Sequence, residues 1–210
     1  MNLENKIIYD ISPLISPKTA VFPGDTPFQQ EFLFKFAAGN NLDLSTIKTT
    51  VHIGAHTDAP SHYHSAGETI EMRDLKLYLG AAQVIEVICP RGARIRKEHL
   101  TQNITAPRVL FKTGSFPDPD TWNDDFNSLS AELVEYLAAQ KVVLVGIDTP
   151  SVDPATDEKL ESHNAIFKHN MAVLEGIVLT GVEPGLYDLI CLPLKISGSD
   201  ASPVRAVLLK

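Results

Sequence analysis

The chain has 210 residues, of which 44% are hydrophobic and 21% charged, and its formal net charge is −8 at pH 7. This length and balance predict one globular domain, residues 1–210, and exclude a disordered or fibrous protein. The negative charge argues against a nucleic-acid partner. Residues 1–6 show no targeting pattern and no apolar run reaches membrane-spanning length, so we expect a cytoplasmic protein without a membrane association.

The two cysteines, Cys89 and Cys191, each lie in an apolar run and form no C-x-x-C pair. This context favours free thiols in a reducing compartment, and a disulfide between them stays an alternative.

The first quarter of the chain predicts strands and one defined loop. Residues 6–11 are a short apolar run typical of a first strand. Two prolines and a glycine in 21–28 predict a loop rather than a regular element. Alternation of apolar and polar residues predicts a half-buried strand at 31–36 and a longer strand at 42–51 that leads into a histidine-rich motif.

Residues 52–64 hold four of the seven histidines, namely His52, His56, His62 and His64. Imidazole and carboxylate groups are usual ligands of zinc-like ions, so His52, His56 and Asp58 offer three ligands within a short stretch. A flat strand would hold the two histidines about 13 Å apart, at roughly 3.3 Å per residue, which is too far to share an ion. A helix would turn Asp58 away from them.

We therefore expect a strand that bends at Gly54, where the missing side chain permits backbone angles that other residues avoid. Pro60 should then keep Ala59 extended, which carries the chain past the ion and lets His62 face the site.

Beyond the motif, buried strands are interspersed with two helical segments. Ser130 is the expected N-cap of the first helix. The predicted elements are a strand at 83–88, a helical turn at 97–100, a strand at 108–113, a loop at 117–126, a helix at 131–140, a strand at 142–148, a helix at 157–167, a strand at 173–179 and two last strands at 189–194 and 198–209. This pattern predicts the α/β class, with a mixed β-sheet and few helices.

Two acidic residues near strand ends need an explanation. Asp148 closes the strand at 142–148, where contact with the site is one possible role and capping the turn at Thr149 and Pro150 is the favoured one. Glu175 lies inside an otherwise apolar strand, and a buried carboxylate without a partner costs several kcal/mol or takes up a proton. A salt bridge to a Lys or Arg and a metal ion are both open as its partner.

At this point the motif carries a family resemblance. His-x-Gly-x-His-x-Asp-x-Pro-x-His at 52–62 resembles the signature of the cyclase family of metal-dependent hydrolases, and the chain is similar to its bacterial kynurenine formamidases (arylformamidases). The resemblance extends to Pro-Gly-Asp-Thr-Pro at 23–27, Gly-Ile-Asp-Thr-Pro-Ser at 146–151 and Asp-Ala-Ser-Pro-Val-Arg-Ala-Val at 200–207. It implies the swivelling β/β/α (cyclase-like) fold and a homodimer.

The resemblance also implies a larger ligand set, because family members carry a histidine twelve residues before a Leu-Glu-Gly glutamate. Here these positions are His163 and Glu175. Five ligand groups exceed what one four-coordinate zinc needs, and carboxylates can bridge, so we expect two Zn²⁺ ions, with Mn²⁺ as an alternative, that share Asp58 and Glu175. His52 and His56 would serve one ion and His163 the other.

The implied reaction is hydrolysis of N-formyl-L-kynurenine to L-kynurenine and formate in tryptophan degradation. His62 matches the family's catalytic position, and we expect it to carry a proton from the attacking water to the leaving nitrogen. Phe22 takes the place of an aromatic residue, usually Trp, that lines the substrate pocket. His64 and His169 match nothing in the family pattern.

Two other functions stay open. A related amidase that opens a cyclic amide such as isatin would use the same metal site. A non-catalytic metal-dependent binding protein would have no use for His62 beside the ions.

Overall fold

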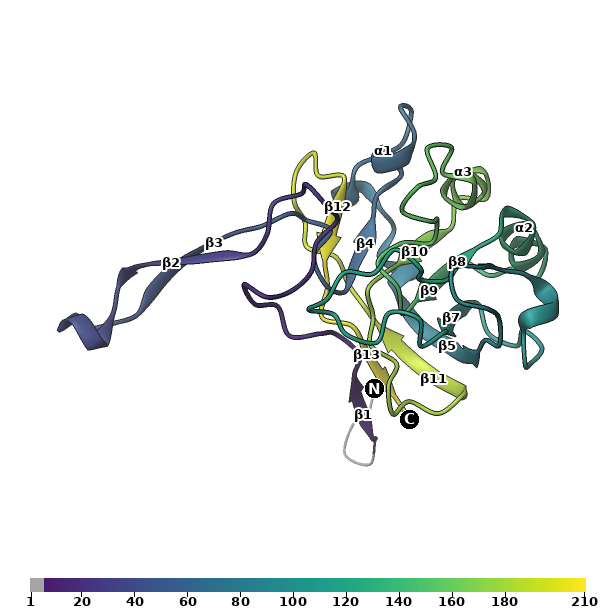
Figure 1. Ribbon diagram of the computed structural model, residues 1–210, viewed down its shortest axis with the longest axis horizontal. Helices are drawn as coiled ribbons and strands as arrows, with labels where there is room; N and C mark the ends of the chain where they lie inside the picture. The colour runs from purple at the N-terminus through teal and green to yellow at the C-terminus, as the bar shows by residue number, and fades with distance from the viewer. Residues whose placement is uncertain (1–5) are drawn as a thin grey trace.

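The computed structural model describes residues 6–210, so the expectation about a targeting pattern at the N-terminus lies largely outside the described residues. A seven-stranded mixed sheet forms the body of the molecule (Figure 1). Its strands, in spatial order, are β1 (Ile8–Asp10), β13 (Val207–Leu209), β11 (Gly185–Ile190), β5 (Leu79–Glu86), β7 (Arg108–Lys112), β9 (Leu144–Ile147) and β10 (Ala172–Leu174). The pairings from β1 to β5 are antiparallel and those from β5 to β10 are parallel. The predicted α/β class with a mixed sheet is confirmed.

Both faces of the parallel strands are buried, which explains their continuous apolar sequences. Neighbouring residues of a strand point to opposite faces, so Leu110 packs into one core cluster while Val109 and Phe111 pack into the other. Helices α2 (Ala131–Ala139) and α3 (Glu161–Lys168) cover the second cluster. The predicted N-cap is confirmed, because Ser130 Oγ accepts a hydrogen bond from the Leu133 backbone N–H.

The remaining elements are short and lie around this sheet. They are β4 (His56–Asp58) paired with β12 (Ala201–Pro203), β6 (Arg94–Ile95) paired with β8 (Ser128–Leu129), helix α1 (Pro60–Tyr63), and 3-10 turns at Phe36–Ala38, Ile70–Met72, Leu75–Tyr78 and Lys97–His99. Within residues 6–210, no helix combines the length and the apolar composition needed to cross a membrane.

An antiparallel hairpin of β2 (Gln29–Phe34) and β3 (Leu44–Lys48) projects away from the body (Figure 1). We call it the arm. All residues of both strands are exposed, including Leu33 at 71% and Ile47 at 61%. The expectation of a half-buried strand at 31–36 is therefore wrong about burial, because the arm has no sheet or helix of its own chain against its apolar side chains.

Three other boundaries differ from the sequence prediction. Helix α3 begins at Glu161 rather than at 157, after Leu160 adopts a left-handed conformation with φ +49°. Strand β10 ends at Leu174, so Glu175 lies just beyond it rather than inside it. The C-terminal segment forms three strands, β11, β12 and β13, where two were predicted, because β12 leaves the main sheet to pair with β4.

Two glycines meet where the histidine motif crosses the chain that leaves β10. Gly54 has φ +58° and Gly176 has φ +65°, and a Cβ atom on Gly176 would lie 2.1 Å from the Gly54 carbonyl oxygen. No flexible side chain can yield at this contact, because the opposing atom belongs to the backbone. The approach of the two segments therefore requires glycine at position 176.

We expect Gly176→Ala to lower the free energy of unfolding by more than about 3 kcal/mol, since it adds a backbone clash to left-handed strain. Gly181→Ala is the matched control, because Gly181 has φ +78° but open space around the missing Cβ. It should cost only about 1 kcal/mol. Urea unfolding of both variants measures the difference, and equal losses would contradict a role for the crossing.

Candidate active site

The histidine motif forms a tight turn followed by a short strand. His52 lies in the turn and β4 begins at His56, so the predicted strand through His52 is wrong. The predicted bend at Gly54 is confirmed by its positive φ. Ala59 is extended, with φ −86° and ψ 152°, as predicted, and Pro60 then starts α1, which carries His62.

Backbone pairing brings Glu175 to this motif. The His56 N–H donates to the Glu175 carbonyl at 3.1 Å, and the Glu175 N–H donates to the His56 carbonyl at 2.9 Å. Residues paired in this way hold their side chains next to each other. His56 Nε2 accordingly lies 3.2 Å from Glu175 Oε2.

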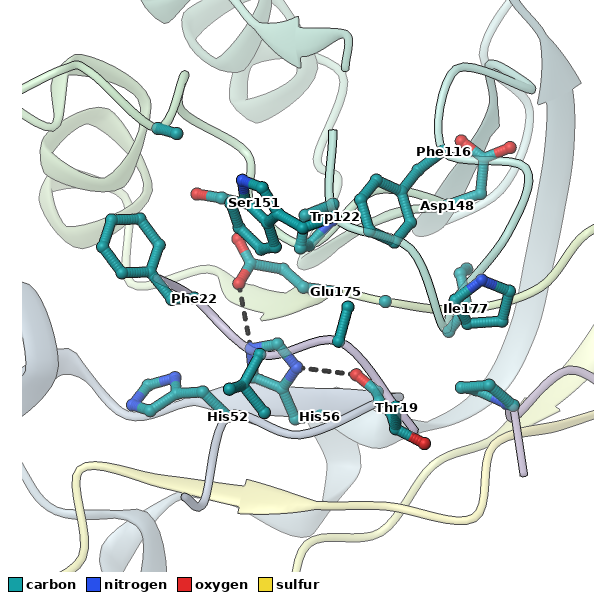
Figure 2. A pocket seen from close by; sticks show the side chains of 18 of the residues that line it. Thr19, Phe22, His52, His56, Phe116, Trp122, Asp148, Ser151, Glu175 and Ile177 are labelled. Carbon is teal, nitrogen blue, oxygen red and sulfur yellow. Dashed lines mark hydrogen bonds and ion pairs between the residues drawn. The ribbon is translucent and has the colours of Figure 1, made fainter. Parts of the chain in front are cut away.

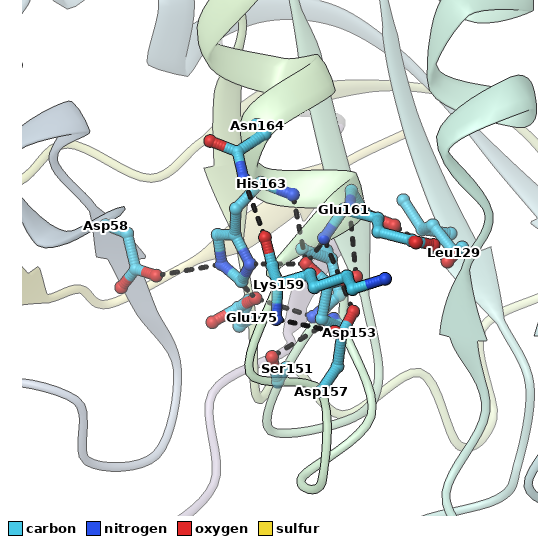
Figure 3. Close-up of polar contacts among 12 residues, drawn as sticks. Asp58, Leu129, Ser151, Asp153, Asp157, Lys159, Glu161, His163, Asn164 and Glu175 are labelled. Carbon is cyan, nitrogen blue, oxygen red and sulfur yellow. Dashed lines mark hydrogen bonds and ion pairs between the residues drawn. The ribbon is translucent and has the colours of Figure 1, made fainter. Parts of the chain in front are cut away.

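The five groups predicted as ligands converge at this crossing. Figure 2 shows His52, His56 and Glu175, and Figure 3 shows Asp58, His163 and Glu175. Asp58 Oδ1 lies 2.9 Å from His52 Nδ1 and 3.5 Å from His56 Nε2, whereas Asp58 Oδ2 lies 3.4 Å from His163 Nε2. Glu175 also faces both sides, with Oε2 toward His56 and Oε1 3.5 Å from His163 Nε2. Each carboxylate thus faces two groups of donors, which is the arrangement that two bridged ions require.

The outer nitrogen of each of these histidines is held by an acceptor. His56 Nδ1 lies 2.9 Å from the Gly54 carbonyl, His163 Nδ1 2.8 Å from Asp153 Oδ2, and His52 Nε2 3.0 Å from Asp200 Oδ2. Because carbonyl and ionised carboxylate oxygens only accept, the outer nitrogen carries the proton in the neutral form of each ring, and that form has its lone pair on the inner nitrogen. This is the usual arrangement around a histidine that binds a metal.

Two of the side-chain atoms that face the centre of the cluster have no hydrogen-bond partner within residues 6–210. Asp58 Oδ1 and His163 Nε2 are buried and have no hydrogen-bond partner among the residues that the structure describes. Lone pairs that face one another in a dry site repel unless a proton or a cation lies between them. The site therefore fits divalent cations with nitrogen and oxygen ligands.

The pKa values of these groups are shifted because carboxylates and imidazoles lie close together in the cluster. Burial disfavours the charged form of His52, but the carboxylates of Asp58 and Asp200 outweigh it and raise its pKa to about 9. Burial is likewise outweighed at His163, where Asp153 and Asp58 raise the pKa well above its ordinary value. Against its burial, the facing His163 and His52 hold the pKa of Asp58 well below the usual range.

Asp153 is a functional residue that sequence reasoning missed. Its carboxylate accepts hydrogen bonds from the backbone N–H groups of Ser162 and His163, from His163 Nδ1 and from Arg94 Nη1 (Figure 3). It therefore fixes both the start of α3 and the ring of His163. A carboxylate a few residues before a helix was the available signal, but its link to His163 is not visible in the sequence.

Asp148 does not cap the turn at Thr149 and Pro150, so that expectation is wrong. It accepts hydrogen bonds from the Thr113 and Gly114 N–H groups and from Thr113 Oγ1, and so ties together the ends of β9 and β7. Burial raises its pKa despite these bonds. Glu175 follows the next parallel strand, so the site lies where the carboxyl ends of these strands meet, a common position for active sites.

A cavity of about 660 Å³ opens onto the cluster. One wall is aromatic, with Phe22, Phe116 and Trp122 close together (Figure 2). Phe22 and Trp122 meet edge to face with ring centroids 5.5 Å apart. Phe22 lines the cavity as predicted. Trp122 lies in the segment 117–126, which the sequence predicts only as a loop, and Phe116 directly precedes that segment, so neither residue was predicted to line the cavity.

The other histidines of the chain take different places. His62 lines the cavity, with its ring centroid 4.2 Å from that of His52. The ring of His64 stacks on that of Phe167, with the ring centroids 3.8 Å apart. His169 Nε2 lies 2.6 Å from Glu135 Oε2. Neither His64 nor His169 lines the cavity, in line with the expectation that they lie outside the site.

Comparison with known proteins gives consistent results. A family model described as putative cyclase matches residues 9–154. The chain is 44% identical over 206 residues to the kynurenine formamidase of Bordetella pertussis, covering 97% of this chain and 98% of the relative. A solved structure described as a potential metal-dependent hydrolase with cyclase activity superposes with a TM-score of 0.84 at 26% identity, over 97% of this chain and 98% of that one. Isatin hydrolase A from Ralstonia solanacearum shares the fold, with a TM-score of 0.81 at 21% identity, over 98% of this chain and 92% of that one.

The pKa shifts predict how pH affects the metal-free protein. His52 titrates near 6.5 when unfolded and near 9 when folded, so its stabilising contribution is complete below pH 6.5 and is lost as pH rises toward 9. We expect the free energy of unfolding of chelator-treated protein to fall by on the order of 2 kcal/mol over this range. Protein loaded with a divalent ion should lose much less, because the cation replaces the protons.

Thermal unfolding at pH 6.5 and at pH 9, with and without chelator, measures how the stability of each form depends on pH. His64→Gln, which changes a histidine outside the cluster, should behave as wild type. An identical pH dependence of the chelated and loaded proteins would contradict the prediction.

Proposed function

Because this chain belongs to the cyclase family, we propose that it is an arylformamidase that hydrolyses N-formyl-L-kynurenine to L-kynurenine and formate in tryptophan degradation. The observation that carries this proposal is the pair of buried carboxylates, each facing two groups of histidine donors, at the bottom of an aromatic-walled cavity. The similarity to kynurenine formamidases along nearly the whole chain supports the choice of substrate.

We assign His52, His56 and Asp58 to one Zn²⁺ ion, and His163 to a second ion that shares Asp58 and Glu175 with the first. Mn²⁺ is the alternative metal. When bound, such ions polarise the carbonyl of the substrate and lower the pKa of water at the site. The protein's own contribution is to hold the donors in place, through the hydrogen bonds that fix the outer nitrogen of each histidine.

The cavity provides two further functions. The aromatic wall formed by Phe22, Phe116 and Trp122 presents flat apolar surface to the aryl ring of the substrate. His62 lies beside the donors and within the cavity, where it can pass a proton from the attacking water to the departing nitrogen. An arylamine leaves far more readily once it is protonated, so this transfer accounts for the need for a titratable group there.

Assay of the purified, zinc-loaded protein with N-formyl-L-kynurenine tests the proposal. We expect substrate turnover, and a fall in kcat of about 10²- to 10⁴-fold in His62→Ala with the metal content unchanged. Isatin serves as the competing substrate, because an enzyme for cyclic amides would use the same donors. Wild-type turnover no higher than that of His62→Ala, or a clear preference for isatin, would contradict the assignment.

We propose a cytoplasmic location on the basis of the thiols. Cys191 is buried, Cys89 is partly buried and both are free in the structure, which suits a reducing compartment.

We also propose that the protein is a homodimer in which the arm packs on a second copy. Exposed apolar side chains on both strands and at the tip, including Leu33, Phe36 and Ile47, form a surface that a monomer would leave in water. An aromatic and aliphatic surface of this kind is typical of a permanent interface.

Leu33→Asp combined with Ile47→Asp should convert the dimer to a monomer, because two carboxylates would be buried at the interface without partners. Light scattering coupled to gel filtration measures the mass. Gln29→Asp adds a charge at an exposed polar position opposite Lys48, on the face of the hairpin away from Ile47, and should remain dimeric. A monomeric wild-type protein would exclude this role for the arm.

A further inference from the structure

Asp200 lies beside the histidine motif because of strand pairing. Strand β12 pairs with β4 in a register that sets Ala201 opposite Asp58. The Ala59 N–H donates to the Asp200 carbonyl at 2.8 Å, which extends the pairing by one step. The backbone thus holds Asp200 next to the turn that leads into α1, and its position does not depend on its side-chain contacts.

The carboxylate of Asp200 contacts two histidines. Its Oδ2 lies 3.3 Å from His62 Nδ1 and 3.0 Å from His52 Nε2. An ionised carboxylate has lone pairs enough to accept from both rings. About half of the Asp200 side chain is exposed, and an aspartate with this exposure is ionised near neutral pH.

This contact decides which nitrogen of His62 can act. An acceptor at Nδ1 requires the proton of a neutral imidazole to be on Nδ1, which leaves the lone pair on Nε2. Nε2 lies on the opposite side of the ring, and no described residue forms a hydrogen bond with it, while His62 itself lines the cavity. The free nitrogen is therefore the one that a proton donor in the cavity can reach.

We propose that Asp200 is a positioning residue, which fixes the ring orientation and the Nδ1–H tautomer of His62 and, through the same oxygen, holds the outer nitrogen of His52. This inference rests on the role proposed above for His62. The carboxylate of Asp200 then holds both rings, so that His62 keeps a fixed position and orientation relative to His52.

The tautomer can be measured without any assay of activity. In zinc-loaded protein labelled with ¹⁵N at histidine, long-range ¹H–¹⁵N correlation spectra distinguish Nδ1–H from Nε2–H imidazoles, and His62→Gln identifies the signals of His62. We expect the Nδ1–H form in wild type and its loss in Asp200→Asn. The side-chain amide is nearly isosteric but can donate to Nδ1, which reverses the tautomer. An unchanged Nδ1–H signal in Asp200→Asn would overturn the proposal.

Kinetics and metal content complete the test. Asp200→Asn should lower kcat about 10- to 100-fold, with a much smaller change in KM and an unchanged number of ions per chain. Asp200→Glu, which restores a carboxylate, should recover part of the loss. Loss of metal from Asp200→Asn, with activity restored by added zinc, would show that Asp200 acts only through His52 and would overturn its role at His62.

Glu71→Ala is the control for a loosened loop. Glu71 Oε1 accepts a hydrogen bond from the Gly198 N–H at 2.8 Å and so tethers the segment that carries Asp200, but it contacts neither histidine. This variant should keep the wild-type tautomer and a kcat near that of wild type. A loss equal to that of Asp200→Asn would overturn the proposal. If wild type fails to hydrolyse formylkynurenine yet shows the Nδ1–H tautomer, the proposed substrate is wrong and the assignment of Asp200 stands.

Discussion

The crossing of the histidine motif with the segment after β10 is the constraint on which the site depends. Two reciprocal backbone hydrogen bonds join His56 to Glu175, and the fit is possible only because Gly176 lies directly against the Gly54 carbonyl. A motif from the first third of the chain and a carboxylate from the last third are thereby fixed as neighbours. Backbone pairing thus positions His56 and Glu175, whereas His163 is carried by α3.

This geometry buries two carboxylates, Asp58 and Glu175, which are each only 2% exposed and line the cavity through their few accessible atoms. Buried carboxylates demand compensating positive charge, and among the described residues the ion-pair partners of Asp58 and Glu175 are all histidines. The outer nitrogen of each histidine is hydrogen-bonded to a fixed acceptor, so the inner nitrogens are aimed at the carboxylates in advance. The same burial favours a cation at this cluster, because a cation between the carboxylates and the histidine nitrogens compensates the buried negative charge.

Sequence reasoning found what is local in the chain and missed what is assembled by the fold. The bend at Gly54 and the extended Ala59 follow from residue types, and the cyclase resemblance supplied His163 and Glu175 as candidates. Asp153 and Asp200 were not identified, because each supports a histidine through a contact that depends on the tertiary structure. The burial of the arm was predicted wrongly for a different reason. An alternating pattern shows that a strand has one apolar face, but it does not show whether the same chain covers that face.

The cavity is lined by two kinds of structure, regular elements that carry the cluster and loops that carry the aromatic wall. The metal donors lie on or next to paired strands and on α3, whereas the aromatic wall comes from two loops, around Phe22 and around Trp122. A substitution in a loop alters the shape of the wall without moving a donor, because no backbone pairing joins Phe22 or Trp122 to the cluster. At position 22 the wall carries Phe, and the neighbouring Trp122 provides an indole surface against it. The same fold can therefore present a differently shaped wall to a substrate while the groups of the cluster keep their positions.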